Sequence, residues 1–423
     1  MRNLLLYIVL LAFILPGCAS QRNISSNNLA FLYRKNEADL HPAFLVYHEK
    51  DSAPRVYFRI ATKELLYERS DPNAQEGIAR IRFKYQLYPA YESRDLVDSA
   101  SVIITDTEGA LNDKEIIGSF TVKLPPKASY LMGIRTTDMV SGNSVVNYLK
   151  IDKLDQNDRE NFLVRSVATG QPVFTYHFQV DQEFLVTCNR PWKRLYGKYY
   201  DREFAIAPAP FALYAAPPFD YDADSLFQLQ PGDTNSVVFK LPSQGLFHLS
   251  LDSATRKGVS LFHFHQQFPK ANTSERLIEP LRYLTTRNEY DALASAESAK
   301  QALDDFWLKN ANSPERAKAL IRSFYNRVQS ANEFFSSHVE GWKTDRGLIY
   351  IVFGPPNIIY KSTNSEVWIY GEENNYMSLN VNFIRVDNPF SANDFRLNRS
   401  PIYKNNWFRA VDGWREGRII THQ

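Results

Sequence analysis

The sequence has very little cysteine, with only Cys18 and Cys188 among 423 residues. Cys188 follows an apolar stretch, a setting typical of a small buried side chain. Cys18 has a separate role that its neighbours indicate below, so we expect no disulfide within the chain. Stability must then come from the packing of apolar side chains.

The net charge is also close to zero. The 49 basic and 47 acidic residues leave +2 at neutral pH. Proteins whose main partner is a nucleic acid or another polyanion usually carry a clear basic excess. We therefore expect neither a nucleic acid nor a polyanionic surface as a dedicated partner.

Signatures of the common enzyme classes are missing as well. The sequence has no G-x-S-x-G nucleophile elbow, no H-E-x-x-H zinc motif, no P-loop and no G-x-G-x-x-G fingerprint. We expect no cofactor and no metal ion, and the sequence favours a protein that is not an enzyme.

No hydrophobic run is long enough to cross a membrane. The longest covers residues 4–15, whereas a transmembrane helix needs about 20 apolar residues. It follows a basic residue and ends at Pro16-Gly17, the pattern of a signal peptide over residues 1–17. The segment Leu15-Pro16-Gly17-Cys18 resembles the lipobox of bacterial lipoproteins. This resemblance implies cleavage before Cys18 and acylation of its thiol, which would anchor the chain in a membrane; the alternative is an ordinary signal peptide beside an incidental cysteine.

Residues 18–28 are mostly polar, and we expect them to form a tether behind the lipidated cysteine. About 400 residues follow, a length that suits two to four domains.

Aromatic residues are abundant, with 24 Tyr and 28 Phe, and they favour β-strands. Residues 29–155 contain short runs of strand character separated by turn residues. The clearest is 81–88, in which apolar and polar side chains alternate. The other strands predicted here are 44–47, 56–60, 101–104, 116–123 and 130–135. Their spacing is typical of an Ig-like β-sandwich.

A second block, residues 156–270, has a similar composition. Strands are predicted at 174–178, 184–186, 237–239, 246–251 and 259–264. Proline-rich segments between them indicate long loops. We interpret this block as a second β-sandwich domain.

Residues 271–338 form a helical segment by composition. A helix is predicted over 289–308. A stronger one is predicted over 314–338, where Ser313 is a good N-cap and Pro314 suits the first helical position. Its apolar residues recur at helical spacing.

Residues 339–423 return to strand character. The apolar run 348–353 is expected to be a strand covered on both faces and ended by Gly354-Pro355-Pro356. Strands are also expected at 366–370 and 378–386. The fold class is therefore multidomain: two Ig-like β-sandwich domains, a helical segment and a small α+β domain.

A distinctive motif stands at the start of this last block. It consists of Gly341, Trp342, Thr344 and Asp345, followed by Gly347. Together with the apolar run and with Gly354, Pro355 and Pro356, it resembles the GWxTD-domain family over roughly residues 275–423. The resemblance implies an exported protein of Bacteroidetes or related phyla, and it brings no biochemical role with it.

The residues of this motif can be explained by structural roles alone, without binding or catalysis. We interpret residues 344–347 as a tight turn closed by Gly347. Trp342 would be the anchor that packs the helices onto the sheet. The alternative is a binding or catalytic role for Asp345, as in a hydrolase with an unrecognised site near Thr344 and Asp345.

Three histidines could together bind a metal ion. His263 and His265 would share one strand face, and His248 would lie on a neighbouring strand. Ordinary solvent-facing histidines are the simpler interpretation.

The segment 220–224 is similar to the opening of a calcium loop, with Asp220, Asp222 and Asp224. Ser225 and Pro231 stand where an EF-hand requires Gly and Glu. We interpret it as a solvated acidic loop, with a different kind of calcium loop as the alternative.

These observations favour a lipid-anchored envelope protein that acts as a non-catalytic scaffold or accessory subunit of an outer-membrane protein complex. Its expected partners are the membrane, through Cys18, and other envelope proteins. Surface-exported lipoproteins of the Bacteroidetes-type envelope resemble one another in an acidic cluster behind the cysteine. None follows Cys18, so we expect a body that faces the periplasm.

The alternative to a scaffold is a protein that binds glycans. Its candidate contacts are Trp192, Tyr196, Tyr199 and Tyr200, because sandwiches often present aromatic rings to sugars. The simpler interpretation of this cluster is packing between domains.

Overall fold

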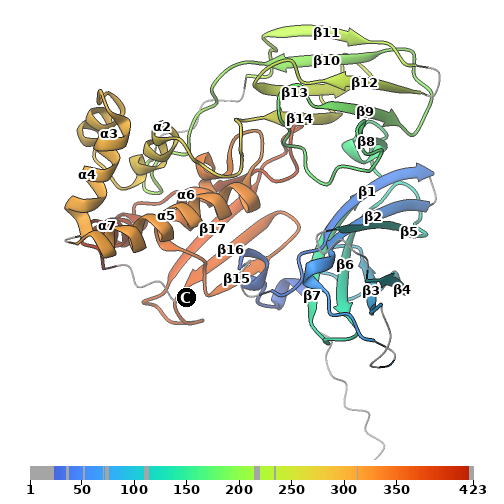
Figure 1. The fold of residues 1–423 in the computed structure, drawn as a ribbon, viewed down its shortest axis with the longest axis horizontal. Helices are drawn as coiled ribbons and strands as arrows, with labels where there is room; N and C mark the ends of the chain where they lie inside the picture. The colour runs from blue at the N-terminus through green and yellow to red at the C-terminus, as the bar shows by residue number, and fades with distance from the viewer. Residues whose placement is uncertain are drawn as a thin grey trace, which may run out of the picture.

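The computed structural model describes residues 23–34, 38–50, 53–69, 71, 76–108, 114–213, 220–232, 235–311 and 313–418. The N-terminal part consists mostly of antiparallel sheets, and helices with a small sheet form the C-terminal part (Figure 1). The predicted signal peptide and Cys18 lie outside the described residues. Within the described ranges, no helix has both the length and the apolar character that crossing a membrane requires.

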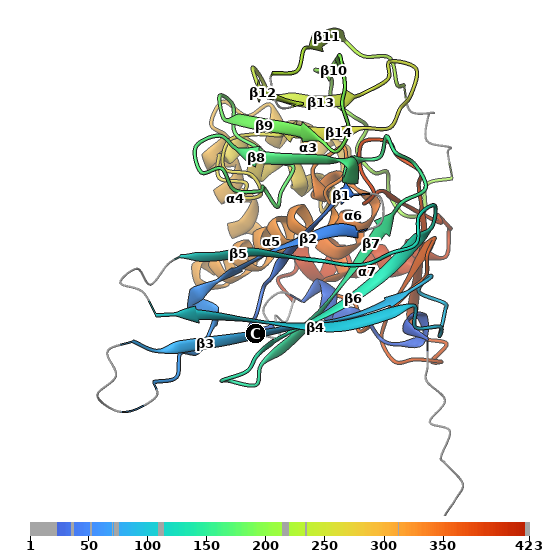
Figure 2. The ribbon, with the colours of Figure 1, turned by 90° about the vertical axis from the view of Figure 1, so that its right-hand side faces the viewer.

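The first β unit consists of two antiparallel sheets that share one core. A three-stranded sheet has the order β1-β2-β5, and a four-stranded sheet has the order β4-β3-β6-β7. Figure 2 shows β3 and β4 below β1, β2 and β5, with β6 and β7 rising on the right of the view. The strands are β1 (Ala43–Lys50), β2 (Ala53–Ala61), β3 (Ile78–Tyr88), β4 (Asp98–Thr107), β5 (Glu115–Thr121), β6 (Ser129–Asp138) and β7 (Ser144–Asp152).

The alternation predicted for residues 81–88 is confirmed in β3. Ile81, Phe83 and Leu87 are fully buried, and the ring of Phe83 lies 4.4 Å from that of Phe58 on β2. The polar residues between them point to the other side of the sheet, since successive strand residues face opposite ways.

The second β unit has the same general build. One sheet has the order β11-β10-β13-β14 and the other β12-β9-β8, with a common apolar core. The strands are β8 (Phe162–Ser166), β9 (Glu183–Cys188), β10 (Leu195–Tyr200), β11 (Ser225–Leu229), β12 (Ser236–Lys240), β13 (Gly245–Ser250) and β14 (Val259–His263).

The strand predicted at 174–178 was wrong. His177 makes a single bridge to Phe262, and no strand forms there. Phe178 is nevertheless buried in the core of this unit. At this bridge the Phe178 N–H donates to the Phe262 carbonyl and the Phe262 N–H donates to the Tyr176 carbonyl, both at 2.8 Å, but a single bridge is too short to count as a strand.

Helices pack against one face of the C-terminal sheet β15-β16-β17-β18, and alternate residues of β17 are exposed on the other face (Figure 1). The sheet consists of β15 (Ile358–Lys361), β16 (Ser365–Tyr370), β17 (Leu379–Arg385) and β18 (Phe395–Leu397). The helices are α2 (Ser274–Ile278), α3 (Arg287–Ala294), α4 (Ala299–Ala311), α5 (Pro314–Phe335), α6 (Asp345–Phe353) and α7 (Tyr403–Arg415). One core joins them, with Trp307, Phe324, Trp368 and Trp414 all buried in it.

The helix predicted after Ser313 is confirmed, since the Ser313 hydroxyl accepts the backbone N–H of Arg316 at 3.2 Å and caps α5. The helix predicted over 289–308 is instead two helices, α3 and α4. They are separated near Ser295, where the backbone leaves helical geometry.

The strand predicted at 348–353 was wrong, because this run forms helix α6. Its residues from Leu348 to Val352 are all buried. A short run that is apolar on every side carries no period by which a strand can be told from a helix. The predicted end was correct: Gly354 follows the helix with a φ of 87°, a conformation that favours glycine.

The tether predicted at 18–28 was wrong for residues 23–28, which pack against the folded body. Ile24 and Leu29 are 8% and 2% exposed. The Asn28 side chain donates to the Asn357 carbonyl at 3.1 Å and accepts the N–H of Ile359 at 3.0 Å. Asn28, one of the polar residues that suggested a free tether, is used in both hydrogen bonds.

Candidate functional site

The motif predicted at 341–347 lies where helix α5 ends and helix α6 begins. A 3₁₀ helix, η7 (Gly341–Lys343), connects them. Side chains of α5 and the residue after it hold this turn: Ser336 Oγ accepts the Gly341 N–H at 2.8 Å, and Asn332 Oδ1 accepts the Trp342 N–H at 3.0 Å.

The two glycines of the motif lie where backbones touch. A Cβ atom at Gly341 would overlap the carbonyl oxygen of Ala331 on α5, and one at Gly347 would overlap the carbonyl oxygen of Gly341. Neither obstacle is the end of a flexible side chain. Only glycine therefore allows α5, η7 and α6 to cross so closely.

Trp342 occupies the core of the C-terminal part. Its side chain is buried and packs near the ring of Tyr283. The Tyr283 hydroxyl donates to the Trp342 carbonyl at 2.8 Å. These contacts join the motif to η6 (Glu279–Tyr283), the 3₁₀ helix that precedes α3.

Thr344 is the N-cap of helix α6. Its hydroxyl accepts the Gly347 N–H at 3.1 Å and donates to the Gly341 carbonyl at 2.7 Å. The tight turn predicted for 344–347 was therefore wrong, because these residues form the first turn of a helix. Thr and Asp favour helix N-termini for the same local hydrogen-bonding reason that they favour turns.

Asp345 is buried and fully engaged. Its carboxylate accepts the Leu397 N–H at 2.8 Å and forms an ion pair with Arg399 through both oxygens. Burial raises the pKa of the Asp345 carboxyl, although the charge of Arg399 opposes this shift. Arg399 also donates to the Pro208 carbonyl at 3.2 Å. Asp345 thus connects α6, the segment after β18 and a loop of the second β unit.

The residue after this aspartate, Arg346, enters a buried charge cluster that the sequence analysis missed. We call the four side chains Tyr33, Arg346, Lys361 and Glu366 the buried charge cluster. Glu366 is 0% exposed, and its carboxylate lies 3.1 Å from the Arg346 guanidinium and 2.9 Å from Lys361 Nζ. The Tyr33 hydroxyl donates to it at 2.9 Å.

Electrostatics keep Glu366 and Lys361 of this cluster ionised. Burial works to raise the pKa of Glu366, but the charges of Lys361 and Arg346 outweigh it and hold the pKa at about 2. Burial likewise disfavours the charged Lys361, and Glu366 overcomes this and raises the pKa of Lys361. Tyr33 lies in η2 (Ala30–Tyr33), so the cluster fixes the N-terminal segment to the C-terminal sheet.

Gly354, Pro355 and Pro356 end α6 and lead into β15. The Tyr370 hydroxyl donates to the Gly354 carbonyl at 2.9 Å. The Arg34 guanidinium donates to the Pro356 carbonyl at 3.0 Å. Both contacts are structural, and the second again involves the N-terminal segment.

A cavity of about 500 Å³ borders the motif, with Thr344, Asp345 and His338 in its wall. The Ser337 hydroxyl lies 3.2 Å from His338 Nδ1, and an oxygen of Asp394 lies 3.8 Å from the same nitrogen. A catalytic triad needs the nucleophile and the carboxylate on opposite nitrogens of the imidazole. These three side chains therefore lack the geometry of a proton relay.

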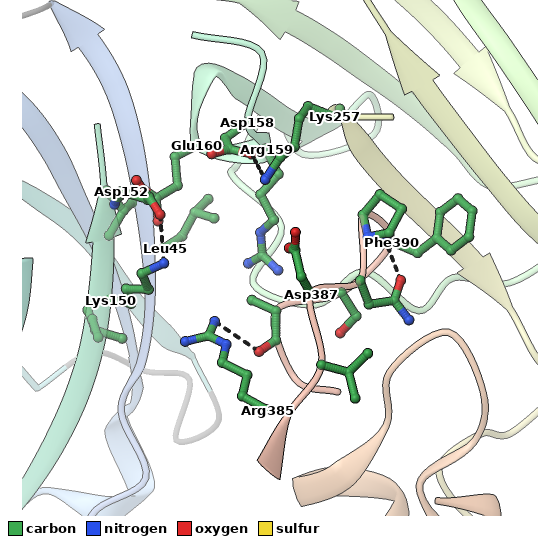
Figure 3. A pocket seen from close by; sticks show the side chains of 18 of the residues that line it. Leu45, Lys150, Asp152, Asp158, Arg159, Glu160, Lys257, Arg385, Asp387 and Phe390 are labelled. Carbon is green, nitrogen blue, oxygen red and sulfur yellow. Dashed lines mark hydrogen bonds and ion pairs between the residues drawn. The ribbon is translucent and has the colours of Figure 1, made fainter. Parts of the chain in front are cut away.

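A second cavity, of about 310 Å³, lies where the first β unit, the second β unit and the C-terminal part meet (Figure 3). Its charges are largely paired: Lys150 lies 2.6 Å from Asp152 and Lys257 lies 3.1 Å from Asp158. The Arg385 guanidinium donates to the Ala392 carbonyl at 3.2 Å. This cavity is the junction of the three parts, and polar contacts line it.

The predicted histidine site does not assemble. His248, His263 and His265 are all buried, so the solvent-facing interpretation was wrong too. Their Nδ1 atoms are each hydrogen-bonded to a different oxygen: Ser260 Oγ for His248, the Phe178 carbonyl for His263 and the Gln266 carbonyl for His265. Over the described ranges, no group of His, Cys, Asp or Glu has the arrangement of metal ligands.

The acidic loop predicted at 220–224 surrounds a guanidinium. Arg202 contacts the Asp220 carboxylate at 2.6 Å and the Asp224 carboxylate at 3.3 Å, and it donates to the Asp222 carbonyl. The oxygens of this loop therefore bind the guanidinium of Arg202.

The aromatic residues proposed as glycan contacts do not form one exposed patch. Tyr200 is buried, and Tyr199 stacks on Phe247 inside the second β unit at 4.5 Å. Trp192 Nε1 donates to the Asn235 carbonyl at 2.9 Å. Cys188 is buried in the same core, as predicted.

The comparisons with known proteins agree with the motif. Residues 245–416 match the model of the GWxTD domain, so the chain contains this domain. The match begins at the first residue of β13, earlier than the expected residue 275, and therefore includes two strands of the second β unit. No curated protein matches the chain.

Proposed function

We propose that this GWxTD-domain protein is a lipoprotein of a Bacteroidetes-type envelope, anchored through Cys18 in the outer membrane and facing the periplasm. There it would act as a non-catalytic scaffold or accessory subunit of an envelope protein complex. The observation that carries the proposal is the complete use of the motif in packing, hydrogen bonding and one ion pair.

The engagement of Asp345 supports a role without catalysis. A general base or nucleophile needs access to a reacting atom. The Asp345 carboxylate is instead held by Arg399 and by the Leu397 N–H. A hydrolase that used this carboxylate would first have to break a buried ion pair.

The contacts between parts of the chain support a scaffold. Asn189 of the second β unit donates to the His48 carbonyl of the first at 2.8 Å. Glu92 of the first β unit accepts the N–H of Thr363 in the C-terminal part at 2.8 Å. These hydrogen bonds join the three parts of the chain to one another, as expected for a platform that carries other proteins.

We also infer that both β units are Ig-like β-sandwiches. Each combines a three-stranded and a four-stranded antiparallel sheet around one core, as many Ig-like domains do. An experimental structure in which the paired sheets had separate cores would contradict this assignment.

Affinity purification of the full-length chain from detergent-solubilised envelopes tests the function. We expect membrane proteins to be recovered in stoichiometric amounts after crosslinking in intact cells. The matched control is Cys18→Ala, which cannot be acylated and should recover fewer membrane proteins. Recovery of the wild-type chain as a clean monomer would contradict the scaffold role.

A further inference from the structure

The outward face of the sheet β4-β3-β6-β7 is strongly basic. Alternate residues of β3 on this face are Arg80, Arg82 and Lys84, and all three are exposed. Lys84 is directly opposite Arg135 of β6. On its other side, β4 places the uncharged Ser101 opposite Lys84 and Ile103 opposite Arg82. We call this surface, together with Arg94 in the loop before β4, the basic sheet face.

Few negative charges balance the basic sheet face. Arg80, Arg82, Lys84, Arg94 and Arg135 form no ion pair with any carboxylate of the described residues. The acidic residues of β4, Asp98 and Asp106, point to the other side, where they accept hydrogen bonds from Tyr85 and Tyr67. At the edge of the face, Asp152 pairs with Lys150.

A hollow of about 340 Å³ opens in this face. Lys84, Arg94 and Arg135 line it together with neutral polar, aliphatic and aromatic side chains, and no carboxylate is among its described lining residues. Gly133 forms its floor beside the ring of Tyr148. Three unpaired cations around one polar hollow suit a phosphate group, which accepts hydrogen bonds from several such donors.

The N-terminal segment places this hollow close to the predicted anchor. Ile24 lines the hollow and packs on Leu131 and Tyr148 of the same sheet face. Asn23 donates to the Glu92 carbonyl at 3.2 Å. It follows Cys18 by five positions, and a chain of that length extends at most about 18 Å. A lipid on Cys18 would therefore hold the basic sheet face near the bilayer surface.

We propose that the basic sheet face docks on the bilayer, with lipid phosphate groups bound at Lys84, Arg94 and Arg135. The choice of lipid as the occupant rests on the proposed function, because it uses acylation of Cys18. Basic residues near an anionic lipid surface each strengthen binding, and the attraction falls off within a Debye length of about 8 Å in physiological salt. The short distance to the anchor satisfies this condition.

Vesicle binding by the mature chain with Cys18→Ser tests the docking surface without acylation. The probe is a vesicle of phosphatidylglycerol and phosphatidylcholine in equal parts, compared with pure phosphatidylcholine. We expect salt-sensitive binding to the anionic vesicle only. Each cation removed should weaken it roughly fivefold, so Lys84→Gln with Arg135→Gln should weaken it roughly 25-fold.

The matched control removes two exposed lysines of α4, with Lys300→Gln and Lys309→Gln, and should bind as the Cys18→Ser chain does. The proposal is overturned if the Cys18→Ser chain ignores anionic vesicles, binds both vesicles alike, or loses as much affinity in the control as in the sheet-face variant. Acylation of Cys18 is measured in a separate experiment. A failure of the docking proposal can therefore be distinguished from a failure of the lipoprotein proposal.

Discussion

Gly341 shows at the scale of single residues why the motif has its composition. The backbones of α5 and η7 meet at this position, and a methyl group would overlap the Ala331 carbonyl. Trp342 fills the core beside it, and Thr344 and Asp345 fix the start of the next helix. Each of these side chains has a packing or hydrogen-bonding reason to be present, which accounts for the motif without a reaction.

Gly341→Ala should lower the free energy of unfolding by about 3 kcal/mol, because the added Cβ must displace helix backbone. Chemical denaturation of the purified chain measures this change. Gly232→Ala is the control, since its Cβ would come no nearer than 3.4 Å to another atom. Equal stability of Gly341→Ala and the wild type would contradict the proposed close crossing.

Glu366→Gln should cost roughly 3–5 kcal/mol of stability, since Arg346 and Lys361 would remain buried without their counter-charge. The comparison is Glu49→Gln, which removes a half-exposed partner of Arg55 and should cost less than about 1 kcal/mol. Urea unfolding of both variants decides the question. Similar losses in the two variants would show that the buried charge cluster has no special role.

The pH dependence follows from the low pKa of Glu366. Its pKa is about 2 in the folded chain and 4.5 ordinarily. The carboxylate therefore stabilises the fold fully above pH 4.5, and this contribution is lost as pH falls toward 2. The stability advantage of the wild type over Glu366→Gln should shrink across that window in a series of acidic buffers. An advantage that stayed constant or grew on acidification would contradict the assignment.

Helix α6 shows at the scale of elements how a cap decides secondary structure. The run from Leu348 is apolar throughout, and the Thr344 hydroxyl starts the helix by accepting the Gly347 N–H. Burial on all sides then follows from the core that α5, α7 and the sheet form around it.

Thr344→Ala should therefore destabilise the chain by about 1 kcal/mol, and more if the bond to the Gly341 carbonyl adds to the cap. Thr344→Ser keeps the hydroxyl and should retain most of the stability. Thermal unfolding of the two variants measures the difference. If serine were as harmful as alanine, the methyl group and not the cap would be the important feature.

The predictions that were correct depended on patterns among residues close together in the sequence. The alternation in 81–88 predicted β3, and Ser313 predicted the start of α5, because each depends on neighbours within a few residues. The run 348–353 misled because it lacks a period. Asn28 and Glu366 could not be interpreted from sequence, since their partners lie far along the chain. The motif was located correctly, but the structural role of Asp345 depends on Arg399, which sequence spacing does not reveal.

The distribution of charge matters at the scale of the whole molecule. The net charge of +2 suggested that no polyanionic surface would be a dedicated partner. Alternation in β3 nevertheless places several cations on one sheet face, while much of the acidic charge is paired elsewhere. The net charge of the whole chain cannot show this separation of charges, because the separation depends on which residues share a face.

The central claim is that lipid at Cys18 attaches this folded body directly to a membrane, and mass spectrometry of the mature N-terminal peptide from the native envelope tests it most directly. We predict that the mature chain begins at Cys18 and that this residue carries acyl chains. A mature chain with an unmodified Cys18, or one that begins at another residue, would contradict the account.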